Sequence, residues 1–260
     1  MDRPTVRPAA TVLALREGPV GPEVLMVRRN LNSDFVGGAY VFPGGALDPS
    51  DASAGSASRS RGCDDATASA TLGLGEGGLA YLVAGARELF EEAGVLLAVD
   101  ESGAPATLDD EARWAANRAA RNDGREAFAD LLEREGLYLD LSGFAYLAHW
   151  VTPVGPPRRF DTRFFCVAAP PGQHGAPDAG ETVASVWIRP ADALAGVERG
   201  DFDMIFPTIR TLESISAATS VDEVLMFARD QGPVTRHEPR IVERDGAIAI
   251  LLPGDDGYAD

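Results

Sequence analysis

The sequence predicts an α+β fold in which a mixed β-sheet is flanked by helices, and two observations support this prediction. Short segments rich in Val, Leu and Phe are bounded by Gly/Pro turns, which is typical of strands. Longer segments between them repeat apolar residues at three- and four-residue spacing, which indicates amphipathic helices. Because 45% of the 260 residues are apolar, the chain can bury a sizeable core, and we expect a single domain, 1–260, that carries insertions and a tail.

The N-terminal part begins with two predicted strands, 9–15 and 23–27. A Gly/Pro turn separates them, so we expect a hairpin or adjacent strands. A backbone break at Pro43-Gly44-Gly45 follows. Residues 48–78 are then dominated by Ser, Ala, Gly and Asp, and we interpret them as flexible or poorly packed, with a loop insertion at about 50–78.

Two helical segments come next. Apolar residues recur at helical spacing from Gly78 to Gly94, and Gly94 suits the position after the last helical residue. A second stretch, 109–135, combines mixed charges with an apolar stripe, and we expect it to pack as a lid or flank, a helical insertion at about 108–136. The stripe consists of Trp114, Phe128, Leu131 and Leu132.

Strands return in the second half of the chain, at 144–151, 159–168 and 182–188. Pro190 then opens a short helix, 190–197. From about 207 we expect a C-terminal extension. It contains helices near 207–217 and 221–229 and a hairpin, 240–252, turned by Asp245-Gly246.

Composition excludes several classes of function. Acidic residues outnumber basic ones by 40 to 23, and the net charge of −17 argues against a nucleic-acid polymer as partner. All basic residues are arginine, which excludes Schiff-base chemistry and a Walker-type phosphate lysine. Cys63 and Cys166 lie far apart without metal-site spacing, and no segment reaches the roughly 20 apolar residues of a membrane span. We therefore expect a soluble cytoplasmic protein with reduced thiols and no membrane partner.

The helix 78–94 carries a cluster of carboxylates. Glu88, Glu91 and Glu92 stand at i, i+3 and i+4 and fall within an arc of ~100°, opposite the apolar face. Like charges at this spacing repel, so a sequence arranged only for helix stability would place arginines among them. A cluster of oxygen ligands is what a hard divalent cation such as Mg²⁺ requires, whereas a solvated acidic face is the alternative interpretation.

The surrounding residues favour the metal site. Arg87-Glu88-Leu89-Phe90-Glu91-Glu92-Ala93-Gly94-Val95 matches R-E-[apolar]-x-E-E-x-G-[apolar], the second half of the Nudix box, so the chain resembles the Nudix hydrolases. This resemblance implies the Nudix fold, an α/β/α sandwich. The first half of the box departs from the pattern, because Asp51 stands in place of a glutamate and lies 36 residues before Arg87 instead of eight. An insertion of 28 residues therefore interrupts the box, and we expect it to be extruded as a loop that leaves the metal face intact.

The resemblance also implies roles for individual residues. Glu88, Glu91 and Glu92 would bind catalytic Mg²⁺ or Mn²⁺, with Glu92 the dominant ligand, and Arg87 would orient the carboxylates. Gly44 and Gly45 would let the loop backbone approach the helix. The general base varies within the family, and Glu181, in a loop before a strand, is our candidate. Each role has an alternative. For the three glutamates it is a solvated acidic face, and for Arg87 it is a surface salt bridge. For Gly44 and Gly45 it is an ordinary turn, and for Glu181 it is the role of a surface glutamate.

A second set of residues resembles the branch that contains the peroxisomal coenzyme A diphosphatases. It comprises His149-Trp150-Val151-Thr152-Pro153, Phe42-Pro43-Gly44-Gly45, the interrupted box and the segment 157–165. In that segment Arg158, Arg159 and Arg163 supply planar donors for diphosphate or 3′-phosphate oxygens, or else they pair with carboxylates of the protein such as Asp161. Trp150 and Phe165 are expected in the core, and His149 is expected to be structural.

These patterns together predict an Mg²⁺-dependent hydrolase that cleaves the diphosphate linkage of a nucleoside-diphosphate-X substrate, with coenzyme A or acyl-coenzyme A as the candidate. ADP-ribose, NADH or another nucleotide is the alternative substrate, and a non-catalytic Nudix-like binding module is the rival of a different class. The expected partner is a small nucleotide-type molecule, and a homodimer is compatible with the sequence. The C-terminal residues Gly257-Tyr258-Ala259-Asp260 form no peroxisomal targeting signal, which agrees with the expected cytoplasmic location.

Overall fold

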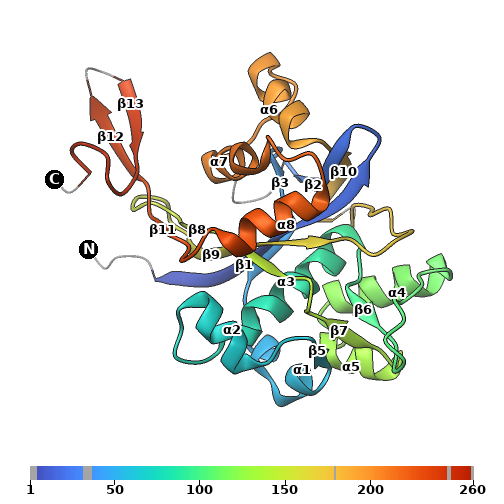
Figure 1. The fold of residues 1–260 in the computed structure, drawn as a ribbon. Helices are drawn as coiled ribbons and strands as arrows, with labels where there is room; N and C mark the ends of the chain where they lie inside the picture. The colour runs from blue at the N-terminus through green and yellow to red at the C-terminus, as the bar shows by residue number, and fades with distance from the viewer. Residues whose placement is uncertain (1–4, 32–36, 179, 245–246, 259–260) are drawn as a thin grey trace.

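A mixed β-sheet forms the centre of the molecule in the computed structural model, which describes residues 5–31, 37–178, 180–244 and 247–258 (Figure 1). Its strands run in the order β10-β2-β1-β9-β8-β11, and two short strands, β3 and β4, pair with β2 and β1. The β1–β9 and β8–β11 pairs are parallel and the others are antiparallel, which confirms the predicted mixed sheet. The strands are β1 (Val6–Gly18), β2 (Gly21–Arg29), β3 (Tyr40–Val41), β4 (Gly44–Ala46), β8 (Ala145–Val151), β9 (Arg159–Ala168), β10 (Thr182–Ile188) and β11 (Arg236–His237).

Helices cover both faces of this sheet, which confirms the α/β/α sandwich. Successive residues of β1 point to opposite faces. Ala10, Val12 and Ala14 join one buried cluster, and Leu13 and Leu15 join the other. The first cluster is closed by α2 (Asp65–Leu72), α3 (Gly78–Ala93), α4 (Glu111–Asn122) and α5 (Phe128–Arg134), and the second by α6 (Pro190–Arg199), α7 (Phe206–Ile215) and α8 (Val221–Asp230).

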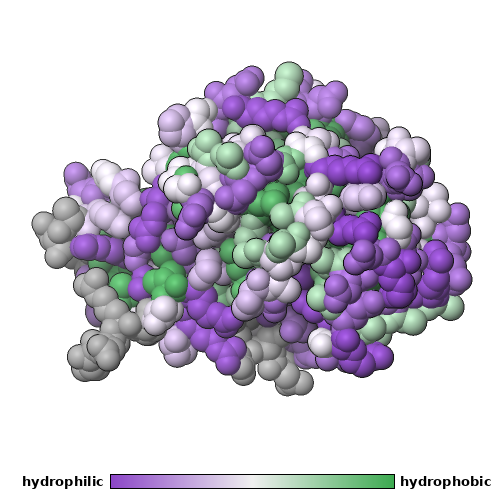
Figure 2. All heavy atoms as spheres, turned by 90° about the horizontal axis from the view of Figure 1, so that it is seen from below, coloured by the Kyte–Doolittle hydropathy of each residue, from purple (hydrophilic) through white to green (hydrophobic). Residues whose placement is uncertain are grey.

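The segment that interrupts the box is folded, so the prediction of a flexible or poorly packed loop is wrong. It contains η1 (Pro49–Ala52), α1 (Ala54–Ser58), β5 (Ser60–Arg61) and α2. Ala68 and Leu72 of α2 are buried in the same cluster as α3. Strand β5 joins a small second sheet with β7 (Tyr138–Asp140) and β6 (Ala98–Val99). Seen from below, the molecule shows more hydrophilic than hydrophobic side chains, as expected for a solvent-facing layer (Figure 2).

Two further boundaries differ from the sequence predictions. The stretch 109–135 forms two helices, α4 and α5, because Gly124 between them has a positive φ of +67° that ends the first. Its stripe residues Trp114, Phe128, Leu131 and Leu132 are all buried, as predicted. The chain beyond 207 is an integral layer of the sandwich rather than an appendage, since α7 and α8 cover one face of the sheet.

The C-terminal hairpin is present and consists of β12 (Arg240–Arg244) and β13 (Ala247–Leu251). It projects beside the N-terminal end of the sheet, near the end of β11 (Figure 1). The predicted turn at Asp245-Gly246 lies outside the described residues. Among the described residues, no helix is both long and apolar enough to cross a membrane.

Candidate active site

Helix α3 presents the carboxylates. It begins at Gly78, where a side chain would collide with α2, because a Cβ there would lie 2.3 Å from the backbone nitrogen of Ser69. It ends next to Gly94, whose φ of +67° suits glycine. Its apolar residues belong to the cluster that packs against the sheet, and Glu88, Glu91 and Glu92 line a cleft. The three carboxylates thus share the cleft as predicted, but Glu92 and Arg87 are buried with the apolar residues of the helix.

Gly44 and Gly45, in the short strand β4, lie directly against these carboxylates. The Gly44 amide donates a hydrogen bond of 3.0 Å to Glu92 Oε2. A Cβ on Gly45 would stand 2.4 Å from Glu88 Oε1, and one on Gly44 would stand 2.6 Å from the Ala10 carbonyl oxygen. A side chain at position 44 would collide with the β1 backbone, and one at position 45 would displace the Glu88 carboxylate, so the two glycines allow the close approach of this backbone to the helix that the sequence predicts.

Arg87 holds the two halves of the interrupted box together. Its Nε and Nη2 donate to Asp51 Oδ1 and Oδ2 at 2.9 and 3.0 Å, and this bidentate pair is buried, with side-chain exposures of 4% and 1%. Its Nη1 lies 2.8 Å from both Glu88 Oε1 and Glu91 Oε2. Burial lowers the pKa of Arg87, but the carboxylates of Asp51, Glu88 and Glu91 raise it by more, so this guanidinium stays charged. Asp51 thus occupies the box position despite the 28 inserted residues, and Arg87 orients carboxylates as predicted.

Glu92 is buried, and Glu88 lies half-buried near it. Burial, and after it the charges of Glu91 and Glu181, raise the pKa of Glu88 to about 7, although Arg87 opposes this shift. Burial and the Glu88 charge raise the pKa of Glu92 well above its usual range, against the Gly44 hydrogen bond and the Arg29 charge. Two carboxylates in such a place repel each other unless a proton or a cation joins them.

Glu181 completes this end of the cleft. It lies in the loop before β10, it lines the same cleft, and its charge raises the pKa of both Glu88 and Glu92. Its backbone is fixed by two hydrogen bonds, from Asn30 N to Glu181 O at 2.8 Å and from Glu181 N to Asp178 Oδ2 at 3.2 Å. The structure therefore brings this residue to the box glutamates across 89 residues of sequence, the separation of Glu92 and Glu181.

Glu91 has different neighbours. Besides Arg87, its carboxylate meets Arg121 of α4, with 2.5 Å between Arg121 Nε and Glu91 Oε1. Arg118, also of α4, donates from Nε to the Glu91 carbonyl at 2.8 Å and from Nη1 to the Pro177 carbonyl at 3.3 Å. The inserted helix α4 thus clamps the end of α3. No spacing in the sequence indicates this contact, because Arg118 and Arg121 resemble part of a solvated charged helix.

The donor set suits a hard divalent cation. Within the described ranges, no three Asp, Glu, His or Cys side chains already stand as a ready metal site, because Glu91 is turned toward two arginines. The buried pair Glu88 and Glu92 nevertheless offers oxygen ligands whose mutual repulsion a cation would remove. Of the three predicted ligands, the structure brings two together, and the assignment of all three stays a prediction.

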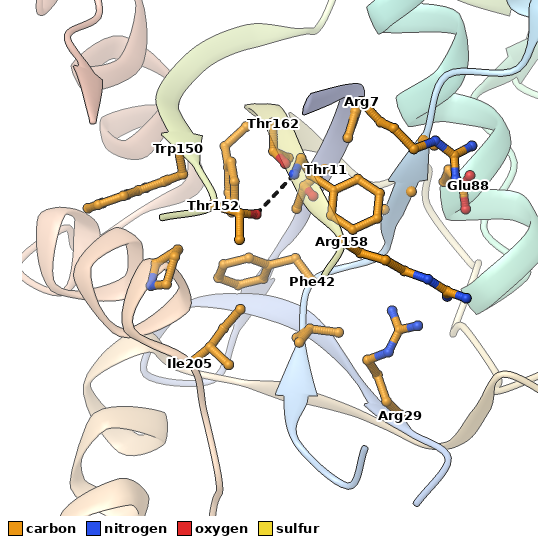
Figure 3. A pocket seen from close by; sticks show the side chains of 18 of the residues that line it. Arg7, Thr11, Arg29, Phe42, Glu88, Trp150, Thr152, Arg158, Thr162 and Ile205 are labelled. Atoms are coloured by element: carbon orange, nitrogen blue, oxygen red, sulfur yellow. Dashed lines mark hydrogen bonds between the residues drawn. The ribbon is translucent and has the colours of Figure 1, made fainter. Parts of the chain in front are cut away.

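The cleft in front of these carboxylates has a volume of about 1220 Å³. Its carboxylate end lies at Glu88 and its opposite end at Trp150 and Ile205, with Arg7, Arg29 and Arg158 pointing into the space near Glu88 (Figure 3). Arg29 Nε is buried with no hydrogen-bond partner among the described residues. Such a donor is available to an anionic ligand.

The predicted substrate arginines are divided between two faces of the β9 segment. Arg158 lines the cleft together with Phe160, Thr162 and Phe164. The cleft lies on the side of the even-numbered residues, because side chains alternate along a strand. Arg159 and Arg163 therefore point to the opposite face, away from the cleft in which the sequence analysis expected them.

Both of these arginines have partners in the protein. Arg159 is buried, pairs with Glu238 and donates from Nε to the carbonyls of Thr152 and Pro153 at 3.0 and 3.2 Å. Arg163 is buried 4.4 Å from the centre of the Tyr81 ring and 3.5 Å from Asp161. Both arginines thus have partners within the protein: for Arg163 this is Asp161, as the alternative interpretation expects, and for Arg159 it is Glu238, which that interpretation does not name.

The aromatic and histidine residues lie as expected. Phe165 is buried in the core, and Trp150 is 6% exposed and donates from Nε1 to Thr211 Oγ1 at 3.2 Å, although one side of it also borders the cleft. His149 Nε2 lies 2.6 Å from Asp161 Oδ1, which agrees with a structural role. Sequence reasoning missed Arg7 and Arg29, since each lies in or at the end of a strand whose partners bring it to the cleft.

Comparisons with known proteins identify the family of the chain. Residues 64–214 match the family model described as the NUDT19 Nudix domain. The chain is 28% identical to proteins named acyl-coenzyme A diphosphatase NUDT19 from Gallus gallus and from Homo sapiens. These alignments cover 94% and 98% of this chain and 74% and 77% of the two relatives. A crystal structure of a NUDIX hydrolase from Alicyclobacillus acidocaldarius is 31% identical with a TM-score of 0.68, over 85% of this chain and 96% of the other. The chain therefore belongs to the Nudix hydrolases, in the family of the NUDT19 Nudix domain, and is an enzyme of that class.

Proposed function

We propose that the protein hydrolyses the diphosphate linkage of coenzyme A and its acyl thioesters with Mg²⁺ or Mn²⁺. The observation that supports this most is the composition of the large cleft, which joins a carboxylate end, three arginines and an apolar end. A nucleotide diphosphate with a long, largely apolar substituent has the same sequence of chemical groups. The names of the relatives from Gallus gallus and Homo sapiens point to the same substrate class.

Glu88 and Glu92 would hold the cation, with Glu91 as a third ligand once it leaves Arg121. A bound divalent cation supplies charge neutralisation at the phosphoryl oxygens and lowers the pKa of a water molecule. Arg87 keeps Glu88 oriented through its 2.8 Å contact, and the Asp51 pair keeps Arg87 in place. Arg7, Arg29 and Arg158 neutralise and position the diphosphate of the substrate.

Glu181 is our candidate for the residue that accepts the proton of the attacking water. It borders the cleft beside Glu88 and Glu92, and its side chain is exposed, so it can exchange the proton with solvent. Attack of water at one phosphorus breaks the anhydride bond and leaves adenosine 3′,5′-bisphosphate and 4′-phosphopantetheine, which keeps the acyl group when the substrate is a thioester. Glu181→Gln should lower kcat with little change in KM, because proton acceptance contributes to the transition state and not to substrate binding.

A panel of coenzyme A, decanoyl-coenzyme A, ADP-ribose, NADH and dinucleoside polyphosphates, each with Mg²⁺, tests this proposal. We expect the highest kcat/KM for the coenzyme A compounds, with both halves identified by mass spectrometry. A clear preference for ADP-ribose or NADH would keep the diphosphatase chemistry and refute the substrate class. Hydrolysis at the thioester instead of the diphosphate would refute the proposal altogether.

A further inference from the structure

The C-terminal hairpin carries an apolar face that the fold leaves open. Ile241, Ile248 and Ile250 are 54%, 79% and 41% exposed. Ile241 pairs directly with Ile250, and Ile248 lies two residues before Ile250 on β13. Side chains alternate across a strand pair, so these three isoleucines share one face of the hairpin. Aliphatic side chains gathered on one face are typical of a binding surface.

Two of the three isoleucines belong to the cleft and the third does not. Ile241 and Ile250 border the same cavity as Glu88 and Glu92, whereas Ile248 lies outside its lining. The neighbouring wall at that end is also apolar and is formed by Trp150, Ile205 and Phe206, and Figure 3 shows the first two opposite Glu88. The open face of the hairpin thus continues the cleft away from its carboxylate end.

Contacts of the segments that flank the hairpin hold its base on the sheet. Just before β12, Glu238 pairs with the buried Arg159 of β9, and Arg236 of β11 lies 3.8 Å from Asp161. Tyr258 donates its hydroxyl hydrogen to the Glu238 carbonyl at 2.7 Å. These contacts fix the start of the hairpin to β9, and Ile241 and Ile250 border the cleft from this fixed base.

We propose that Ile241 and Ile250 form the wall that binds the fatty acyl chain of an acyl-coenzyme A, so that the hairpin sets the preference for acylated over free coenzyme A. This inference rests on the proposed function, because the diphosphate must lie at Glu88 and Glu92 and the acyl chain is the apolar end of such a substrate. Each methylene that moves from water onto an apolar wall contributes favourably to binding, so affinity rises with chain length until the wall is covered.

The test compares Ile241→Ser/Ile250→Ser with Ile248→Ser, which removes an isoleucine from the same face but outside the cleft. Calorimetry with decanoyl-coenzyme A and with coenzyme A measures the gain in affinity that the acyl chain provides. EDTA is present so that neither ligand is hydrolysed. We expect the double variant to lose about 25- to 100-fold of this gain, since each half-exposed isoleucine that the acyl chain covers contributes a factor of roughly five to ten. The double variant should bind coenzyme A as the wild type does. Ile248→Ser should bind both ligands as the wild type does. Circular dichroism checks that all variants are folded.

Several results would overturn the inference. The first is equal affinity of the wild type for decanoyl-coenzyme A and coenzyme A. The second is a loss of affinity for decanoyl-coenzyme A in Ile248→Ser that is as large as the loss in the double variant. A dimer that becomes monomeric in the double variant, seen by sedimentation velocity, would assign the face to a second copy of the chain. The proposed function is measured separately, by turnover with Mg²⁺. If coenzyme A is hydrolysed but the acyl chain has no effect on affinity, the proposed function stands and only the role of the hairpin is refuted. If affinity depends on the acyl chain but no substrate is hydrolysed, the proposed function is refuted and the hairpin still binds the acyl chain.

Discussion

Replacing Glu92 with Gln removes one charge from the buried carboxylate pair and keeps the shape of the side chain. The amide oxygen of the new side chain can still accept the hydrogen bond from Gly44, so the loop contact, 3.0 Å in the wild type, is retained. The loss of a metal ligand should cost several kcal/mol of transition-state stabilisation, and Mg²⁺-dependent kcat should fall by about 10²- to 10⁴-fold. Glu76→Gln, at an exposed residue just before α3, is the matched control and should retain full activity.

The same substitution should stabilise the metal-free protein. Two charges at i and i+4, ~6 Å apart, repel by roughly 3 kcal/mol at an effective dielectric constant of about 20. The folded pKa of Glu88 is about 7, above the 4.5 of the exposed group. The contribution of protonated Glu88 to the free energy of unfolding is therefore fully present below pH 4.5 and is lost as the pH rises through about 7. At about pH 8 without metal, the variant should gain on the order of 1–3 kcal/mol over the wild type, and its stability should fall less between these limits.

Urea denaturation in EDTA across this pH range measures the gain, and thermal melting with and without Mg²⁺ measures metal binding. Mg²⁺ should raise the Tm of the wild type and of Glu76→Gln, but that of Glu92→Gln much less, because a ligand that binds only the folded state stabilises it. Near-normal Mg²⁺-dependent turnover of Glu92→Gln, together with an unchanged Mg²⁺-induced rise in Tm, would refute the assignment of Glu92 to the metal site.

Three further tests address other parts of the site. Arg158→Ala should raise the KM for coenzyme A about tenfold or more, because the substrate loses a charge-assisted contact in the cleft. Arg163→Ala should leave KM unchanged and lower the free energy of unfolding by about 1–3 kcal/mol. The opposite pattern would place Arg163 at the substrate. Asp51→Ala leaves the buried Arg87 guanidinium without its bidentate partner and should cost about 3–5 kcal/mol in urea denaturation, and a cost below about 1 kcal/mol would show that the pair is dispensable. Leu72→Ala should cost about 2–3 kcal/mol if α2 is part of the core, while a near-zero cost would return the insertion to a loosely attached loop.

The elements with a clear local pattern were predictable. The helix 78–94 and the strand 182–188 match α3 and β10 within a residue, because apolar periodicity and glycine at the helix end act over a few neighbouring residues. The same is true of the carboxylate face, since i, i+3 and i+4 positions share one side of any α-helix. The insertion was not predictable in this way. Its core contacts use Ala68 and Leu72 among small and polar residues, and such a composition resembles that of a loop until a neighbouring helix covers it.

Which face of β9 meets the cleft was equally beyond a local pattern. Alternation separates Arg159 and Arg163 from Phe160 and Thr162, but it does not say which set faces the cleft. That depends on the segments that cover each side of the sheet, and the partner of Arg159, Glu238, comes from a segment 79 residues later. Arg118 and Arg121 are comparable, because only the packing of α4 on α3 brings them to Glu91.

Local sequence was enough to predict the carboxylate face of α3, the close approach of the glycine loop and the alternation of strands and helices, because each of these depends on residues close together in the chain. Long-range packing was needed to bring Asp51 to Arg87 across the insertion, Glu181 to Glu88 and Glu92, and the hairpin to the far end of the cleft. These contacts join segments tens to hundreds of residues apart. Their geometry follows from how the sheet is ordered and which helices cover it, and the burial of apolar surface over the whole chain sets that arrangement.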